Sequence, residues 1–383
     1  MLVPQGRGSL AEQAREILTL QEQILARQEQ PMTVTSQTVF LREPESLTPC
    51  ETILLEHYGA KRPITNMVFQ PPCCGAALAL EAWAIGGRDV RIEQGGEHTL
   101  TVSYDGTRWI YCAGLRSEGS RGGIYGQTIA VLKRMQRALE QAGGGFEHVL
   151  RTWFYLGGIT ETEAGLQRYM ELNRARTDFY RRIKFHCSVA QPSIPQGIYP
   201  ASTGIGMSGS GLVAGSLALQ TQRGDAFLLP LENPQQTPAY AYHPRHSPQS
   251  PKFSRGVALV LDNYITTWVS GTASVVHSLS RHPGDIRKQT EQTVENIEKL
   301  ISADNFVFHG IKHPGARLND LAKVRVYLKR AEDFSVCKAI CEKRFGSVPA
   351  IYAVADVCRP ELLVEIEGVA FTKRARPLQN ART

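Results

Sequence analysis

Hydrophobic and polar positions repeat in the same order in two parts of the chain. In the first part, a strand ends at Tyr111-Cys112-Ala113-Gly114 and is followed by a polar loop and an amphipathic helix. In the second part, Trp268-Val269-Ser270-Gly271 precedes the same succession. The helix positions with i, i+3 or i+4 spacing are Ile129, Leu132, Met135 and Leu139 in the first copy, and Thr290, Val294, Ile297 and Ile301 in the second.

The similarity continues beyond these helices. Strand patterns with a Tyr-Leu pair occupy residues 148–156 and 320–328, and a second helix follows each of them. A final pair of strands opens with Pro200-Ala201 in one copy and Pro349-Ala350 in the other. Each copy therefore predicts a β-α-β-α-β-β module of about a hundred residues, a normal size for a folded unit. We interpret the order as a duplication, although the drifting spacing leaves chance similarity as the alternative.

The remaining segments complete the predicted organisation. Strand patterns near Thr65–Phe69 and Val90–Ile92 indicate a third, degenerate partner over residues 36–100. Residues 229–254 carry a proline every few positions, which excludes a regular helix or a central strand, and their aromatics favour an ordered loop over a flexible linker. The predicted parts are a helical extension (1–35), an N-terminal region (36–225), a proline-rich active-site loop (226–256), a C-terminal domain (257–373) and a basic tail (374–383).

Composition and charge narrow the classes of function. The 383 residues are 42% hydrophobic and 21% charged, which is typical of a globular protein. The sequence contains neither an apolar run of the roughly 18 residues needed to span a bilayer nor the apolar centre of a secretory signal. The net charge of +7 is dispersed, which fits an anionic small substrate better than nucleic acid. We predict a cytoplasmic protein that binds neither nucleic acid nor membranes.

Metal-binding patterns are weak. The eight cysteines form no pair of CxxC motifs, so a structural zinc site is disfavoured and reduced thiols are expected. His277 and His282 flank Arg281 in a polar loop, but no carboxylate motif accompanies them. We therefore predict no metal and no cofactor.

Several longer motifs carry a family resemblance. They are residues 199–206 (YPASTGIG), 230–240 (PLENPQQTPAY), 250–255 (SPKFSR), 270–274 (SGTAS) and 355–368 (ADVCRPELLVEIEG). With these motifs the chain resembles a chorismatase from about Thr33 to Phe371, and its second copy resembles the small RidA (YjgF) imine deaminases. The resemblance implies an α/β (α+β) fold in which duplicated RidA-like modules form a composite, pseudo-trimer-like enzyme in one chain, with the site between modules.

The resemblance also implies the reaction. It implies that chorismate is cleaved to pyruvate and 3-hydroxybenzoate, 4-hydroxybenzoate or both, and the motifs look closest to the branch that forms both. Hydrolysis to a dihydroxycyclohexadiene carboxylate is the alternative within the family. A RidA-like imine deaminase or metabolite-binding module is the rival from another class. It is disfavoured because RidA proteins carry a carboxylate-binding Arg after Pro-Ala, where this chain has Ser202 and Ile351.

Cleavage of the enolpyruvyl ether requires a proton on its methylene carbon, and a positioned general acid delivers it. Alternation over residues 362–367 places Glu365 and Glu367 on one strand face. Taken from the strand alone, two solvated glutamates would be the ordinary interpretation. The resemblance instead assigns the acid to the first glutamate of the motif, Glu365, with Glu367 as second choice. Such an acid must be buried to stay protonated.

The two carboxylates of chorismate need cationic and hydroxyl partners, and the guanidinium group matches a carboxylate best. Any one of these residues, taken alone, is more often a surface ion pair or a packed ring than a substrate contact, so the candidates are assigned as a set. We expect small residues near Thr272 and Val354 to shape the pocket, and the sequence leaves the oligomeric state open. The predicted substrate-binding residues are Arg151, Tyr155, Tyr240, Tyr242, Lys252, Arg255, Gly271 and Ala273.

Overall fold

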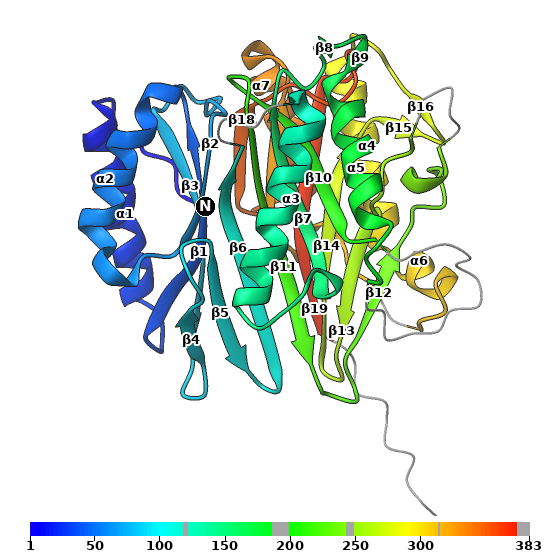
Figure 1. Cartoon of the computed structure of the whole chain (residues 1–383). Helices are drawn as coiled ribbons and strands as arrows, with labels where there is room; N and C mark the ends of the chain where they lie inside the picture. The colour runs from blue at the N-terminus through cyan, green and yellow to red at the C-terminus, as the bar shows by residue number, and fades with distance from the viewer. Residues whose placement is uncertain (118–121, 186–198, 243–248, 313–314, 374–383) are drawn as a thin grey trace, which may run out of the picture.

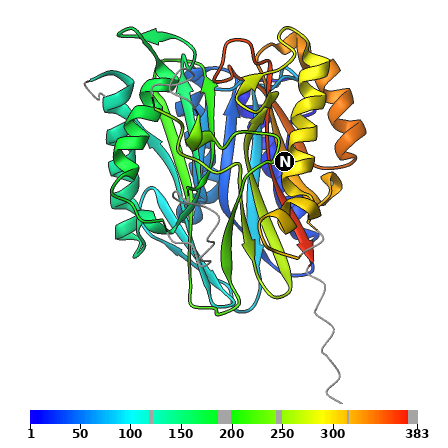
Figure 2. The ribbon, with the colours of Figure 1, turned by 90° about the vertical axis from the view of Figure 1, so that its right-hand side faces the viewer.

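The computed structural model describes residues 1–117, 122–185, 199–242, 249–312 and 315–373. The predicted basic tail at 374–383 lies outside these residues. The described chain forms three main sheets and two small two-stranded ones. The strands of the main sheets lie in the interior, and long helices cover the outside (Figures 1 and 2). None of its helices is long and apolar enough to cross a membrane.

The first sheet has three strands in the order β2-β1-β3, formed by β1 (Met32–Leu41), β2 (Ile64–Val68) and β3 (Leu78–Gly86). Helices α1 (Leu10–Ala26) and α2 (Leu47–Tyr58) cover its outer face (Figure 1). Helix α1 begins with a capping box, in which Ser9 and Glu12 satisfy backbone N–H groups of the first turn. Its apolar face buries Ala14, Ile17 and Leu18 in a cluster with α2 and β3.

The second sheet has the order β10-β7-β11-β6-β5-β4, and helices α3 and α4 cover it. Its elements are β4 (Arg91–Gln94), β5 (Thr99–Tyr104), β6 (Thr107–Arg116), α3 (Gly123–Gln141), β7 (Val149–Gly157), α4 (Arg168–Tyr180), β10 (Ala201–Met207) and β11 (Leu212–Thr221). The short pair β8 (Thr162–Glu163) and β9 (Leu166–Gln167) precedes α4.

The third sheet has the order β12-β13-β14-β19-β17-β18, and α5 to α7 accompany it. Its elements are β12 (Phe227–Leu231), β13 (Gly256–Val260), β14 (Tyr264–Ala273), α5 (Ile286–Ile301), α6 (Ala303–Phe308), β17 (Leu321–Leu328), α7 (Phe334–Phe345), β18 (Ala350–Val354) and β19 (Val364–Lys373). A small pair, β15 (Val275–Val276) and β16 (Leu279–Ser280), follows β14.

The second and third sheets have the same strand order and connectivity, so the structure shows the duplication. Each repeat contains two strands more than the predicted β-α-β-α-β-β module, β4 and β5 in one and β12 and β13 in the other. The strand expected at Val90–Ile92 therefore belongs to the second sheet, because β4 pairs with β5, and not to the preceding segment. Pro230 lies in β12, an edge strand of its sheet, as its missing N–H requires.

The three sheets meet through a common core. Phe40 on β1, Tyr155 on β7 and Tyr327 on β17 are fully buried in one apolar cluster that draws residues from all three sheets. The helices lie on the far faces of these sheets. This arrangement is the pseudo-trimer-like composite that the sequence predicts, and it leaves clefts where one sheet meets the next.

Candidate active site

One cleft lies where the edge strand β10 of the second sheet meets β14 of the third. The backbone N–H of Ser202 donates to the Ser270 hydroxyl over 2.9 Å. The N–H of Gly271 donates to the Thr203 hydroxyl over 3.1 Å. These two contacts join the repeats through polar groups and set the floor of the cleft.

A cavity of about 480 Å³ opens beside this junction. Its walls come from α4, β10, the end of the proline-rich loop, β14, the loop that follows β18, and β19. Five of the residues predicted from the sequence line it, namely Tyr242, Arg255, Gly271, Ala273 and Glu365. The volume suits a single small-molecule ligand.

Glu365 lies on β19 opposite Ala273 of β14, and only 4% of it is exposed. Burial raises the pKa of its carboxyl to about 8, and the negative charge of Glu367 adds to this effect. None of the described residues donates a hydrogen bond to the Glu365 carboxyl. The group is therefore protonated at neutral pH and faces the cavity, as a general acid must.

Gly271 makes room for this carboxyl. The pairing of β14 with β19 shifts register between Val269 and Thr272, which is a local bulge. A Cβ atom at position 271 would collide with the Glu365 carboxyl group. Glycine at this position therefore allows the acid to lie against the strand and still reach the cavity.

Glu367 lies two residues further along the same strand face, but its surroundings are opposite in character. Burial alone would raise its pKa, yet Arg151, Arg325 and Lys323 outweigh burial and lower it. Its Oε2 accepts a hydrogen bond from Arg151 over 2.6 Å, and Arg325 lies 3.0 Å from its Oε1. Glu367 is therefore an ionised, fully paired carboxylate behind Glu365.

Arg151 and Tyr155 do not lie on the cavity wall, which corrects the expectation that they contact a substrate. The guanidinium of Arg151 is buried and donates to Thr203 and to Glu367, each over 2.6 Å. The Tyr155 hydroxyl, also buried, accepts a hydrogen bond from Arg325 over 2.7 Å. Alternation places both side chains on the interior face of β7. There their polar groups bond to members of the charge network around Glu367 and not to the cavity.

Arg255 and Tyr242 are on the wall and act as a pair. The Arg255 guanidinium is buried and donates to the Tyr242 hydroxyl over 2.5 Å and to the Thr237 carbonyl over 3.2 Å. Its Nε atom has no hydrogen-bond partner among the residues that the structure describes. This cation is therefore held in place by the proline-rich loop while retaining unused donor capacity.

Tyr240 and Lys252 lie in the same loop but are not among the residues that line the cavity. The ammonium of Lys252 donates to the Ser250 hydroxyl over 3.2 Å and lies 3.4 Å from the Tyr240 carbonyl. Both contacts hold the loop to itself. A direct contact of either residue with a substrate remains a prediction.

Two wall cations were missed from the sequence. Arg176 on α4 donates to Ser202 over 3.2 Å and to Asn173 over 2.6 Å, and its Nε has no partner within the described part of the chain. Arg359, in the loop before β19, donates to the Ser278 carbonyl over 3.0 Å. The signal for Arg176 was available, because Tyr169, Asn173 and Arg176 have i, i+4, i+7 spacing and form one polar helix face.

Comparisons with known proteins agree with this architecture. Residues 81–218 match the model of the chorismatase FkbO/Hyg5-like N-terminal family, and residues 247–372 match that of endoribonuclease L-PSP. A 3-hydroxybenzoate synthase of Streptomyces hygroscopicus is 34% identical over 328 residues, which are 84% of this chain and 88% of the relative. This chain belongs to the chorismatase family.

Two further chorismatases extend the comparison. One, from Streptomyces rapamycinicus, is 31% identical over 70% of this chain and 78% of the relative. A crystal structure of a chorismatase aligns with a TM-score of 0.67 and 23% identity, covering 88% of this chain and 93% of the other. The latter likeness shows that the two proteins share a fold.

Proposed function

We propose that this chorismatase-family protein cleaves the enolpyruvyl ether of chorismate, releasing pyruvate and 3-hydroxybenzoate, with Glu365 as general acid. The observation that carries the proposal is a carboxyl group protonated at neutral pH on the wall of a cavity that also presents arginines. The relative named 3-hydroxybenzoate synthase supports the choice of product.

The first step is proton transfer. Glu365 gives its proton to the terminal methylene carbon, which becomes the methyl group of pyruvate, and the ether carbon becomes an oxocarbenium ion. The Glu365 carboxylate left behind is next to this cation, and the two opposite charges stabilise each other at a buried position. The bond between the ring carbon and the ether oxygen then breaks, and pyruvate leaves with this oxygen as its keto oxygen. The neighbouring ring hydroxyl oxygen moves to the vacated carbon, and the ring becomes aromatic by losing a proton, which restores the Glu365 acid. The atoms of the two products sum to those of chorismate, so no electron acceptor is needed.

The wall cations hold the dianionic substrate. Arg255 and Arg176 line the cavity and are fixed by protein hydrogen bonds, and the Nε donor of each has no partner among the described residues. Arg359 adds a third positive charge at the same wall. Fixed guanidinium groups orient carboxylates through charge-assisted bonds, so they align the methylene carbon with Glu365.

Product analysis tests the proposal. The purified protein should release pyruvate from chorismate, which a coupled lactate dehydrogenase assay records, together with 3-hydroxybenzoate, which chromatography resolves. A second product, 4-hydroxybenzoate, remains a prediction from the sequence motifs. A dihydroxycyclohexadiene carboxylate as sole co-product would contradict the assigned reaction, and ammonia release from an imino acid without pyruvate from chorismate would favour the RidA-like rival. We also propose a cytoplasmic location.

A further inference from the structure

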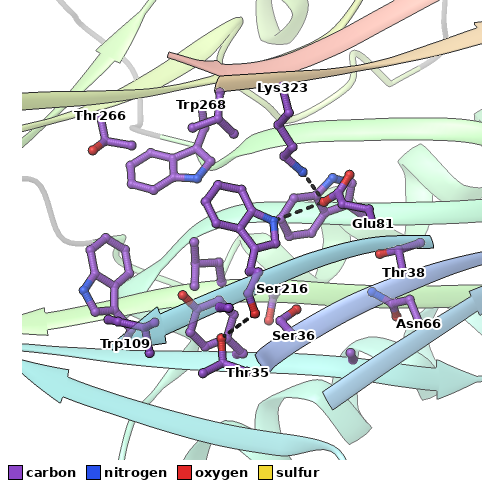
Figure 3. Close-up of a pocket in the computed structure, with 18 of the residues that line it drawn as sticks. Thr35, Ser36, Thr38, Asn66, Glu81, Trp109, Ser216, Thr266, Trp268 and Lys323 are labelled. Atoms are coloured by element: carbon purple, nitrogen blue, oxygen red, sulfur yellow. Dashed lines mark hydrogen bonds and ion pairs between the residues drawn. The ribbon is translucent and has the colours of Figure 1, made fainter. Parts of the chain in front are cut away.

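A second cavity, of about 310 Å³, lies where all three sheets converge (Figure 3). All four tryptophans of the sequence line it: Trp83, Trp109, Trp153 and Trp268. They come from β3, β6, β7 and β14, so every sheet contributes at least one indole. A volume at the lower end of the range for small-molecule sites suits a single ring.

This cavity is separate from the catalytic one. On one face of β19, Glu365 faces the catalytic cavity, whereas Val369 and Phe371 line the second cavity. Glu365 and Phe371 are roughly 20 Å apart, given the rise per residue of an extended strand. The ion network of Glu367, Arg151 and Arg325 fills the space between them.

The second cavity has an entrance from solvent. Its rim includes Ile85 and Tyr264, which are partly exposed, and Phe371, which is 44% exposed. A ligand therefore has a path that does not cross the catalytic cavity.

The polar groups of this cavity favour an anion. Figure 3 shows Lys323 reaching into it toward Glu81; its ammonium forms an ion pair with this carboxylate and lies 4.9 Å from the centre of the Trp83 ring. The ion network that includes the Lys323 ammonium has more side-chain cations than carboxylates. The cations are Lys323, Arg325 and Arg151, and the ionised carboxylates are Glu81 and Glu367. An aromatic cage would otherwise suit a cationic ligand. Here the excess positive charge repels a cation and therefore disfavours its binding.

Two further polar groups are poorly satisfied. Among the described residues, the buried Trp109 indole nitrogen and Ser216 hydroxyl make no hydrogen bond of normal geometry, and their polar neighbours are only the Tyr104 hydroxyl and the Cys112 thiol. Unsatisfied buried polar groups are uncommon in folded proteins and call for an explanation. A ligand with oxygen atoms supplies acceptors for both groups, whereas a hydrocarbon does not.

We propose that the central cavity is a second ligand-binding site, for a flat, single-ring aromatic carboxylate whose ring stacks on the indoles and whose carboxylate meets Lys323. Aromatic stacking supplies the affinity for the ring, and the ammonium supplies the preference for an acid. The proposal does not depend on the reaction at Glu365.

Benzoate is the probe, and quenching of intrinsic tryptophan fluorescence is the measurement, because the indoles line this cavity. We expect saturable quenching in the wild type. Thr266→Phe on β14 and Ser36→Phe on β1 fill the cavity from two different sheets, and each should weaken binding by about tenfold or more. Thr33→Phe, on an exposed position of β1, is the matched control and should bind as the wild type does.

Lys323→Met tests the ligand class without filling space, with exposed Lys338→Met as its control. It should weaken benzoate binding by about tenfold, the value of a charge-assisted bond, and leave binding of benzyl alcohol unchanged. Circular dichroism establishes that each variant is folded. Unaltered quenching by benzoate in the folded filled variants would overturn the site, and equal affinity of the wild type for benzyl alcohol and benzoate would overturn the assignment of an acid.

Discussion

The two repeats have the same strand order, yet only the second carries the buried glutamate that we propose as the general acid. Tyr155 on β7 pairs with Val213 on β11, and the corresponding Tyr327 on β17 pairs with Glu365 on β19. Val213 therefore occupies in the first repeat the position that Glu365 occupies in the second. The same comparison matches Gly215 with Glu367.

The difference has a local physical cause. At Gly215 a Cβ atom would lie 2.8 Å from the Asn66 side chain, so the first sheet fills the space that a glutamate would need. Trp153 pairs with Gly215, whereas Arg325 pairs with Glu367 and neutralises it. The comparison teaches that the shared fold supplies equivalent strand positions, while the residues at those positions and the side chains packed against them determine which repeat holds a buried carboxyl group.

Replacing Glu365 by Gln should have the largest effect, because the side chain keeps its size and loses its acidic proton. We expect kcat for pyruvate release to fall by about 10² to 10⁴ with little change in KM, the signature of a group that acts in the transition state. The exposed Glu332→Gln variant is the control. Near-normal turnover in Glu365→Gln together with an inactive Glu367→Gln would move the acid by two positions.

Glu367→Gln should act mainly on stability. It leaves Arg151 and Arg325 buried without their shared carboxylate, and breaking a buried ion pair costs about 3–5 kcal/mol in the free energy of unfolding. Urea denaturation measures this loss. Glu295→Gln, which breaks the surface pair with Lys299, should cost less than about 1 kcal/mol. Equal losses in both variants would contradict the network described behind Glu365.

Arg176→Met and Arg255→Met should weaken substrate binding, because each removes a fixed guanidinium from the cavity wall. A charge-assisted bond corresponds to a rise in KM of about 10- to 100-fold. Arg174→Met, on the exposed side of the same helix as Arg176, should leave KM unchanged. A normal KM in both wall variants would show that the substrate carboxylates bind elsewhere.

The smallest expected effect is that of pH on kcat, which should change little near neutrality. Because burial raises the pKa of Glu365 to about 8, the acid is protonated below that pH and loses its proton as the pH rises through it. We expect kcat to be flat between pH 6 and 7, about one to two units below this pKa, and to fall about tenfold for each further pH unit well above 8. Steady-state pyruvate assays across this range measure it, and a limb near pH 4.5 would contradict the assignment.

Much of the fold was predictable because the duplicated order of strands and helices is written in local hydrophobic periodicity. The additional strands β4, β5, β12 and β13 were not part of the predicted module, since short strands such as Arg91–Gln94 carry little periodic signal. The placement of β4 in the second sheet depends on pairing between strands rather than on its own sequence.

The candidate site was predictable only in part. Alternation placed Glu365 and Glu367 together, but it was equally compatible with solvated glutamates, and only the packed repeats show why their protonation differs. Arg151 lies in the predicted strand, yet its guanidinium turns to Glu367 rather than to the cavity. Arg359 lies in a loop, where no periodicity indicates which residue will face a cavity.

A titration of the Glu365 carboxyl tests the central claim most directly. In protein labelled with carboxyl-¹³C glutamate, the NMR signal absent from Glu365→Gln identifies this residue, and its chemical shift can be followed with pH. We predict a midpoint near 8, set by burial and by the charge of Glu367. A midpoint near the ordinary glutamate value of about 4.3 would show that Glu365 is ionised at neutral pH and would contradict its role as the acid.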